Sequence, residues 1–185
     1  MLKKIETTIW EGNNATPGEF EGLARDAGPI GTDGNTVLSG AAFDTGANVL
    51  LNLEAIFNGT NGIIPTSPAI IDKEDFTLYV SPKVALLYQQ ELASKGYLNE
   101  YFVNEKPMNY MGYEMVVCPG MSNHRIIGAQ KSNLYFGCNT MTDMTSVRVI
   151  DRTPIDGSDN VRIAMRYSAN VQIGVAADTF IVKEA

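Results

Sequence analysis

Met111-Gly-Tyr-Glu-Met-Val-Val-Cys-Pro-Gly120 opens the last third of the chain, and a series of similar short runs follows it. These runs are Arg125-Ile-Ile-Gly-Ala129, Asn133-Leu-Tyr-Phe-Gly137, Ser146-Val-Arg-Val-Ile-Asp151, Asn160-Val-Arg-Ile-Ala-Met-Arg-Tyr167 and Val171-Gln-Ile-Gly-Val-Ala-Ala177. Each is rich in hydrophobic or β-branched residues, and Gly, Pro, Asn and Asp separate them. This pattern predicts a succession of short strands. No motif for a nucleophile, a metal cluster or a phosphate loop runs through them.

Upstream of these strands, residues 46–58 are predicted to form a helix. Hydrophobic residues recur there at helical spacing and make one apolar face, which consists of Val49, Leu50, Leu53, Ile56 and Phe57. Asp44 or Thr45 can cap the start of this helix, because their side chains accept hydrogen bonds from the first free amides. Gly59 can end it.

A second helix follows the predicted strand Phe76-Thr-Leu-Tyr-Val80 directly. Ser81 and Pro82 are the residue types preferred at the N-cap and at the first helical position. Gly96 is expected to end the helix. Its apolar face is predicted to consist of Val84, Leu87, Tyr88 and Leu92.

The N-terminal part gives weaker signals. Ile5-Glu-Thr-Thr-Ile-Trp10 is β-branched and aromatic, which predicts a strand, and residues 19–27 could form a short helix. Residues 27–40 hold many glycines and are predicted to be a mobile loop, without the spacing of a phosphate-binding loop. Residues 58–68 and 96–111 are expected to be turn-rich or irregular. Two main helices with a mixed or antiparallel sheet make an α+β protein.

Composition limits the function. A chain of 185 residues with a formal charge of −7 can bury a core, but its scattered basic residues argue against a dedicated nucleic-acid binder. No apolar run is long enough to cross a bilayer, and the polar residues near Glu6 interrupt any signal-peptide core. Cys118 and Cys138 lack metal spacing, so free thiols are expected, with a disulfide or a metal role as alternatives.

Candidate catalytic groups are few. His124 is the only histidine, and it lies in a polar turn near Ser122. The surrounding sequence lacks the second glycine of a nucleophile elbow. This absence makes the evidence for a hydrolase weak. A small hydrolase that uses Ser122 and His124, or a carboxylate pair, is kept as an alternative. The acidic turn that holds Asp151, Asp156 and Asp159 does not have the alternating ligand spacing of a calcium loop.

The order of elements resembles the C-terminal part of the major capsid (coat) protein of tailed bacteriophages, which has the Hong Kong 97-like fold. The strand and helix of residues 76–92 resemble a unit of that family's axial domain. Residues 111–121 and 125–134 resemble its following strands, and residues 161–182 resemble its closing pair. Residues 9–23 are similar to the turn after the family's long spine helix.

The resemblance implies three parts: residues 1–45 as a partial peripheral domain with a strand and mobile loops, 46–145 as the axial domain, and 146–185 as closing strands. The N-terminal arm, the extended hairpin loop and most of the spine helix of the family have no counterpart here. The chain is therefore expected to be a trimmed, split or degraded copy of a coat protein.

The implied function is a structural virion protein of a tailed phage or prophage, made in the bacterial host cytoplasm. It would assemble with itself into hexamers and pentamers, and would meet the phage's scaffold, protease or portal proteins. No catalytic residue, cofactor, metal, specific nucleic acid or membrane is expected. An encapsulin-like shell or another phage assembly protein is the second alternative. The expected subunit-interface residues are Tyr97, Tyr101, Phe102, Tyr110, Arg125, Arg148, Arg162 and Arg166.

Overall fold

The structure is a computed structural model that describes residues 2–38, 41–96, 108–122, 124–138, 147–151, 157, 160–165 and 168–183. Two compact units are present, one made of Met1–Tyr135 with Val171–Ala185 and the other of Phe136–Asn170. The helices and strands are α1 (Leu2–Glu11), α2 (Pro29–Asp33), β1 (Asn35–Leu38), α3 (Gly46–Asn58), α4 (Ile63–Thr66), η1 (Pro68–Asp72), β2 (Phe76–Val80), α5 (Pro82–Ser94), β3 (Asn109–Tyr110), β4 (Tyr113–Val117), β5 (Ile126–Gln130), η2 (Lys131–Asn133), β6 (Leu134–Cys138), β7 (Val147–Asp151), β8 (Val161–Met165), β9 (Ala169–Ile173), η3 (Ala176–Asp178) and β10 (Thr179–Lys183).

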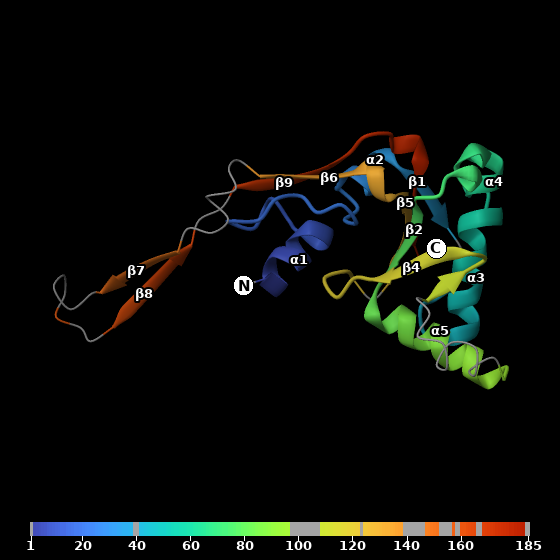
Figure 1. Ribbon diagram of the computed structural model, residues 1–185, viewed down its shortest axis with the longest axis horizontal. Helices are drawn as coiled ribbons and strands as arrows, with labels where there is room; N and C mark the ends of the chain where they lie inside the picture. The colour runs from blue at the N-terminus through green and yellow to red at the C-terminus, as the bar shows by residue number, and fades with distance from the viewer. Residues whose placement is uncertain are drawn as a thin grey trace. The chain divides into compact units, whose positions relative to one another are not determined.

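A mixed sheet forms the centre of the larger unit (Figure 1). In the part of the chain that the structure describes, it has six strands in the order β1-β10-β5-β2-β4-β3. The pairs β1–β10 and β2–β4 are parallel, whereas β10–β5, β5–β2 and β4–β3 are antiparallel. The predicted α+β class with a mixed sheet is confirmed.

The central strands are buried on both faces of this sheet. Every residue of β2 and β5 is buried. Because successive side chains of a strand point to opposite faces, Leu78 and Ile126 enter one hydrophobic core, and Tyr79 and Ile127 enter the other. Strands of this kind read as continuous hydrophobic runs, and a layer of helices must cover each face.

Helices α3 and α5 cover one face, as Figure 1 shows. The predicted bounds of α3 are confirmed, and the Thr45 side chain accepts a hydrogen bond from the Asn48 amide at 3.3 Å. Gly59 follows as the C-cap. Residues Val49, Leu53 and Ile56, taken from the predicted apolar face, are fully buried against the sheet.

Helix α5 also begins where the sequence predicts. Ser81 is fully buried, and its hydroxyl accepts the amide of Val84 at 3.3 Å, while Pro82 is the first helical residue. The chain turns out of the helix at Gly96, whose φ of +83° favours glycine. The buried Ser81 therefore caps α5 directly after β2.

Helix α1 lies on the other face and corrects a prediction. The sequence predicted a strand over Ile5–Trp10, but Leu2–Glu11 is helical. Tertiary packing overrides the β-branched composition: Thr8 and Trp10 are buried, and the Trp10 ring lies 5.3 Å from that of Tyr79. The Thr8 hydroxyl donates to the Lys4 carbonyl one turn back at 2.8 Å, which satisfies the buried hydroxyl.

The segment after α1 also differs from the predictions. Residues 19–27 form turns and no helix, because the amides of Leu23 and Ala24 donate to the carbonyls of Ile9 and Trp10 at the end of α1. Residues 27–40 were predicted to be a loop, but they hold α2 and β1. Strand β1 exists because β10 pairs with it, and that long-range pairing leaves no local pattern. Within residues 58–68, α4 forms one turn.

The predicted predominance of strands after Gly112 is confirmed. In the smaller unit β7 and β8 pair antiparallel, from Val147 opposite Met165 to Asp151 opposite Val161. Strands β6 and β9 form a separate two-stranded pair. Asn133 holds the start of β6 in place: its side-chain oxygen accepts the Val175 amide at 2.6 Å, and its side-chain nitrogen donates to the Val175 carbonyl at 2.8 Å.

Replacing Gly120 with alanine tests the close packing of α1 against the backbone at Gly120. The new Cβ would lie 2.6 Å from the carbonyl atoms of Glu6, which a Cβ cannot occupy. We expect a loss of about 1–3 kcal/mol in the free energy of unfolding, as in overpacked cores. Trp10, the one tryptophan of the chain, reports the displacement by fluorescence. Gly137→Ala is the control, since its Cβ would meet nothing within 4 Å; equal spectra for both variants would contradict this packing.

Replacing Ser81 with alanine tests the start of α5. The buried Val84 amide would lose its acceptor, so we expect the free energy of unfolding in urea to fall by about 1–2 kcal/mol. Ser94→Ala in the last turn is the control, because this serine is exposed and its hydroxyl donates only to the Glu91 carbonyl. A Ser81 variant as stable as the Ser94 variant would contradict the assigned cap.

Candidate assembly surfaces

Arg125 is held within its own chain by a group of ion pairs. Its Nε lies 3.5 Å from Glu11 Oε1, and its Nη1 donates to Asp26 Oδ1 at 3.0 Å. Lys183 Nζ reaches the same Asp26 oxygen at 2.8 Å. The group therefore ties α1 and the following turn to β5 and β10. The Arg125 side chain is 16% exposed, and its expected role at a subunit interface stays a prediction.

The two carboxyls of this group are shifted in opposite directions. Hydrogen bonds from Arg125 and Lys183 lower the pKa of Asp26 to about 2. Burial raises the pKa of Glu11, against the opposing effects of the Ser122 amide and of Arg125. The 70% exposure of the Asp26 side chain leaves its ion pairs open to screening by salt.

Tyr110 belongs to a group of aromatic rings under the edge of the main sheet. Its ring lies 5.9 Å from Phe57 and 6.3 Å from Tyr88, and Phe57 also stacks with Tyr113 at 5.4 Å. The Tyr88 hydroxyl donates to the Asn109 carbonyl at 3.0 Å. Tyr110 is half-buried and packs against its own core. The other predicted aromatic contacts, Tyr97, Tyr101 and Phe102, lie outside the described residues.

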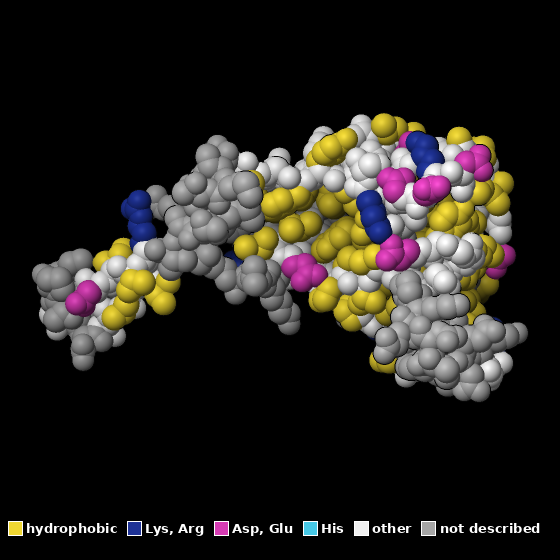
Figure 2. Space-filling model, viewed as in Figure 1, with side chains coloured by type: hydrophobic (Ala, Val, Ile, Leu, Met, Phe, Trp, Pro, Cys, Tyr) yellow, Lys and Arg dark blue, Asp and Glu magenta, His cyan; other side chains and the backbone are white. Residues whose placement is uncertain are grey.

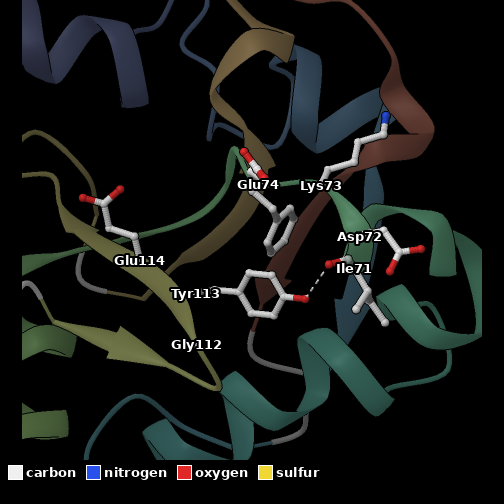
Figure 3. Close-up of a pocket in the computed structure, with 8 residues that line it drawn as sticks. Ile71, Asp72, Lys73, Glu74, Gly112, Tyr113 and Glu114 are labelled. Atoms are coloured by element: carbon white, nitrogen blue, oxygen red, sulfur yellow. Dashed lines mark hydrogen bonds between the residues drawn. The ribbon is translucent and has the colours of Figure 1, made fainter.

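An open hollow of about 300 Å³ lies beside Tyr113 (Figure 3). Its lining mixes both charges, with the Tyr113 hydroxyl donating to the Ile71 carbonyl at 3.1 Å. Lys73 and Glu114 each lie near an opposite charge: Asp178 at 3.8 Å and Lys131 at 2.5 Å, respectively. The hollow therefore resembles an ion-paired surface more than a site that holds a substrate.

The hydrolase alternative gains no support from the geometry around Ser122. Its amide donates to Glu11 Oε1 at 3.1 Å, and the contact found between Ser122 and His124 runs from the backbone amide of His124 to the serine hydroxyl, at 3.5 Å. The His124 ring packs edge-on to Phe43 at 6.4 Å. The described residues contain no group of three potential metal ligands.

Cys118 and Cys138 are both free, as expected. Burial, with a smaller effect from Glu6, raises the pKa of the Cys118 thiol to about 12. A thiol with such a pKa stays protonated near neutral pH, so Cys118 is a core residue and a poor nucleophile. Among the described residues, no helix is long and apolar enough to cross a membrane.

The β7–β8 ribbon carries Arg148 and Arg162, both exposed. In the register of the pair, Arg162 stands opposite Ile150, which lies two residues after Arg148, so the two arginines share one face. The alternate face holds Val149, Val161 and Ile163, which are 68%, 62% and 69% exposed. Figure 2 shows hydrophobic side chains gathered on this ribbon. Arg166 lies outside the described residues.

Sequence reasoning found the two arginines of this ribbon but missed its apolar face. The alternation of Arg148 with Val149 and of Val161 with Arg162 was visible in the sequence. What was missing was the register, because only the pairing of Val149 with Ile163 puts the apolar residues of both strands on one face.

The chain matches no protein-family model and no curated protein, but its structure is similar to solved particle structures. The capsid of an empty GTA particle gives a TM-score of 0.62 at 16% identity, covering 98% of this chain and 62% of that chain. A chain of Mycobacterium phage Che8 gives 0.57 at 11% identity, covering 84% and 55%. A virus-like particle from Pyrococcus furiosus gives 0.51 at 12% identity, covering 98% and 63%.

These similarities show that the chain has a phage major-capsid-like fold, as the order of its elements predicted. The chain spans between 55% and 63% of the length of these three structures. The Hong Kong 97-like form of the fold stays a prediction.

Acid titration tests the ion pairs of Asp26. Its folded-state pKa of about 2 lies below the ordinary value of 3.8, so its ionised form stabilises the fold above about pH 4, and this contribution disappears as the pH falls through 2. We expect the difference in free energy of unfolding between the wild type and Asp26→Asn to shrink over this range.

Glu11→Gln is the contrasting variant for this titration. The pKa of Glu11 is raised, so the wild type loses stability as the pH rises above 4.5, and the variant should gain stability relative to the wild type there. Denaturant unfolding between pH 2 and 7 measures both curves. The same pH dependence for the two variants would contradict the assigned shifts.

Proposed function

We propose that this chain is a structural subunit of a phage or prophage shell, with no enzymatic activity. The observation that carries the proposal is the likeness over 98% of the chain to both the capsid of an empty GTA particle and a virus-like particle. In a shell, identical subunits present complementary patches, and the rotation between them closes the assembly. Hexamers and pentamers of this chain in a virion follow from that role.

The chemistry of the described residues agrees with this role. The ion pairs of Arg125, Lys183 and Lys131 join elements of the fold, and the buried Cys118 is protonated near neutral pH. The apolar side chains of the β7–β8 ribbon lie exposed and are available for contacts. Exposed apolar groups that gather on one face are a feature of interaction sites.

Further parts of the proposal rest on the family resemblance. Residues 1–45 would belong to a peripheral domain, 46–145 to an axial domain, and 146–185 to closing strands. Scaffold, protease and portal proteins would be the partners during assembly in the host cytoplasm. The proposed contacts between subunits involve Tyr97, Tyr101, Phe102, Tyr110, Arg125, Arg148, Arg162 and Arg166.

Light scattering of the purified chain over a wide range of concentrations tests self-association, with electron microscopy of the heaviest fractions. We expect masses that rise with concentration in multiples of the 20.1 kDa chain. A chain that stays a folded monomer at every concentration contradicts the proposed function.

Charge reversal tests the proposed role of the ribbon arginines. Arg148→Glu with Arg162→Glu should weaken association about tenfold or more, because like charges would face the partner. Lys83→Glu with Lys95→Glu, at the start of α5 and just after its end, makes the same change in net charge elsewhere and is the matched control. Equal weakening by the two pairs would show that net charge alone matters and would exclude a specific role for these arginines.

A further inference from the structure

The β7–β8 ribbon has two chemically different faces. On one face Val149 stands opposite Ile163, and Val161 lies two residues before Ile163 on the same strand, the spacing that keeps side chains on one face. All three are more than 60% exposed. Asp151 stands opposite Val161 at one end of this face. On the other face lie Arg148 and Arg162, with Ile150 opposite Arg162. One face of the ribbon is therefore mainly apolar, and the other carries the two arginines.

A ribbon of this kind is not expected to be stable by itself. Two strands without a third strand or a packed helix are marginally stable in water. Cross-strand apolar pairs such as Val149 and Ile163 stabilise a sheet mainly when their face is covered. The ribbon forms its own compact unit within Phe136–Asn170, so its face needs a covering surface from outside that unit.

Charge favours a second copy of the chain as that surface. The segment Phe136–Asn170 holds four arginines and four aspartates and is neutral, so the rest of the chain carries the whole formal charge of −7. A neutral ribbon with arginines on one face can lie on the acidic body of another copy without the repulsion that two acidic bodies would meet. A nucleic acid would instead require a basic surface.

We propose that the Val149, Val161 and Ile163 face of the β7–β8 ribbon packs against a second copy of this chain, while Arg148 and Arg162 face acidic side chains of the assembly. The proposal rests on the proposed function, because self-assembly supplies the second copy at high local concentration. The apolar face supplies the association energy, and the arginines orient the ribbon.

The test replaces two apolar side chains with polar ones of similar size. Val149→Asn with Ile163→Asn should weaken association at least tenfold in sedimentation or light scattering, because the covered face would bury amides without partners. Trp10 fluorescence during unfolding should stay as in the wild type, since Trp10 reports the core of the larger unit. Val149→Leu with Ile163→Leu should keep the association.

Leu51→Asn with Leu86→Asn is the matched control. These two residues lie on α3 and α5 and are 54% and 55% exposed, and the proposal gives them no role. Their replacement should leave association within about twofold of the wild type. If this pair weakens association as much as the ribbon pair, surface hydrophobicity in general drives assembly, and the proposed docking face is wrong.

The outcomes separate the two proposals. If the wild type assembles and the Val149 and Ile163 variant assembles equally well, the docking face is wrong and the shell function stands. If the wild type stays monomeric at every concentration, the shell function fails. A monomer whose ribbon amides are protected from hydrogen exchange would identify the chain's own larger unit as the cover and would overturn the docking proposal.

Discussion

The burial of one mixed sheet on both faces is the constraint on which the larger unit depends. Strands β2, β5 and β10 send alternate side chains into two hydrophobic cores. Each core needs its own covering layer, since a sheet with one apolar face exposed to solvent would be unstable in water. Helices α3 and α5 cover one face, and α1 with α2 covers the other. Gly120 and Arg125 help to hold the second layer against the sheet. Gly120 lets the backbone of α1 approach closely, and Arg125 forms an ion pair with Glu11 of α1.

The second layer is held by means that differ from those of the first. Helices α3 and α5 have local signals, a capping side chain and an apolar face, and they pack against the sheet with large aliphatic residues. Helix α1 depends on backbone approach at Gly120, on Trp10 packing against Tyr79, and on the carboxylates around Arg125. The raised pKa of Glu11 makes its contribution to stability greater at low pH, whereas the lowered pKa of Asp26 makes its contribution greater at neutral pH. The layer therefore combines dense packing with a charge arrangement that responds to acid and salt.

The two units differ in a way that suits the proposed shell subunit. In the larger unit Arg125, Lys131 and Lys183 are engaged in ion pairs within the chain. The smaller unit has a ribbon whose apolar face the described chain leaves exposed. A stable body with an incomplete ribbon is a sensible arrangement for a protein that assembles with copies of itself, because folding and association then depend on different residues.

The sequence by itself determined the α+β class, α3 and α5 with their caps, the strand before α5 and the run of strands after Gly112. Those features have local causes: helical periodicity, a serine followed by a proline, and hydrophobic runs between turn residues. Only the tertiary structure decided that Ile5–Trp10 is helical, that β1 exists, and that Val149 faces outward beside Ile163. The physical reason is the same in all three cases. Packing against a sheet and strand register depend on partners far along the chain, and no local pattern encodes them.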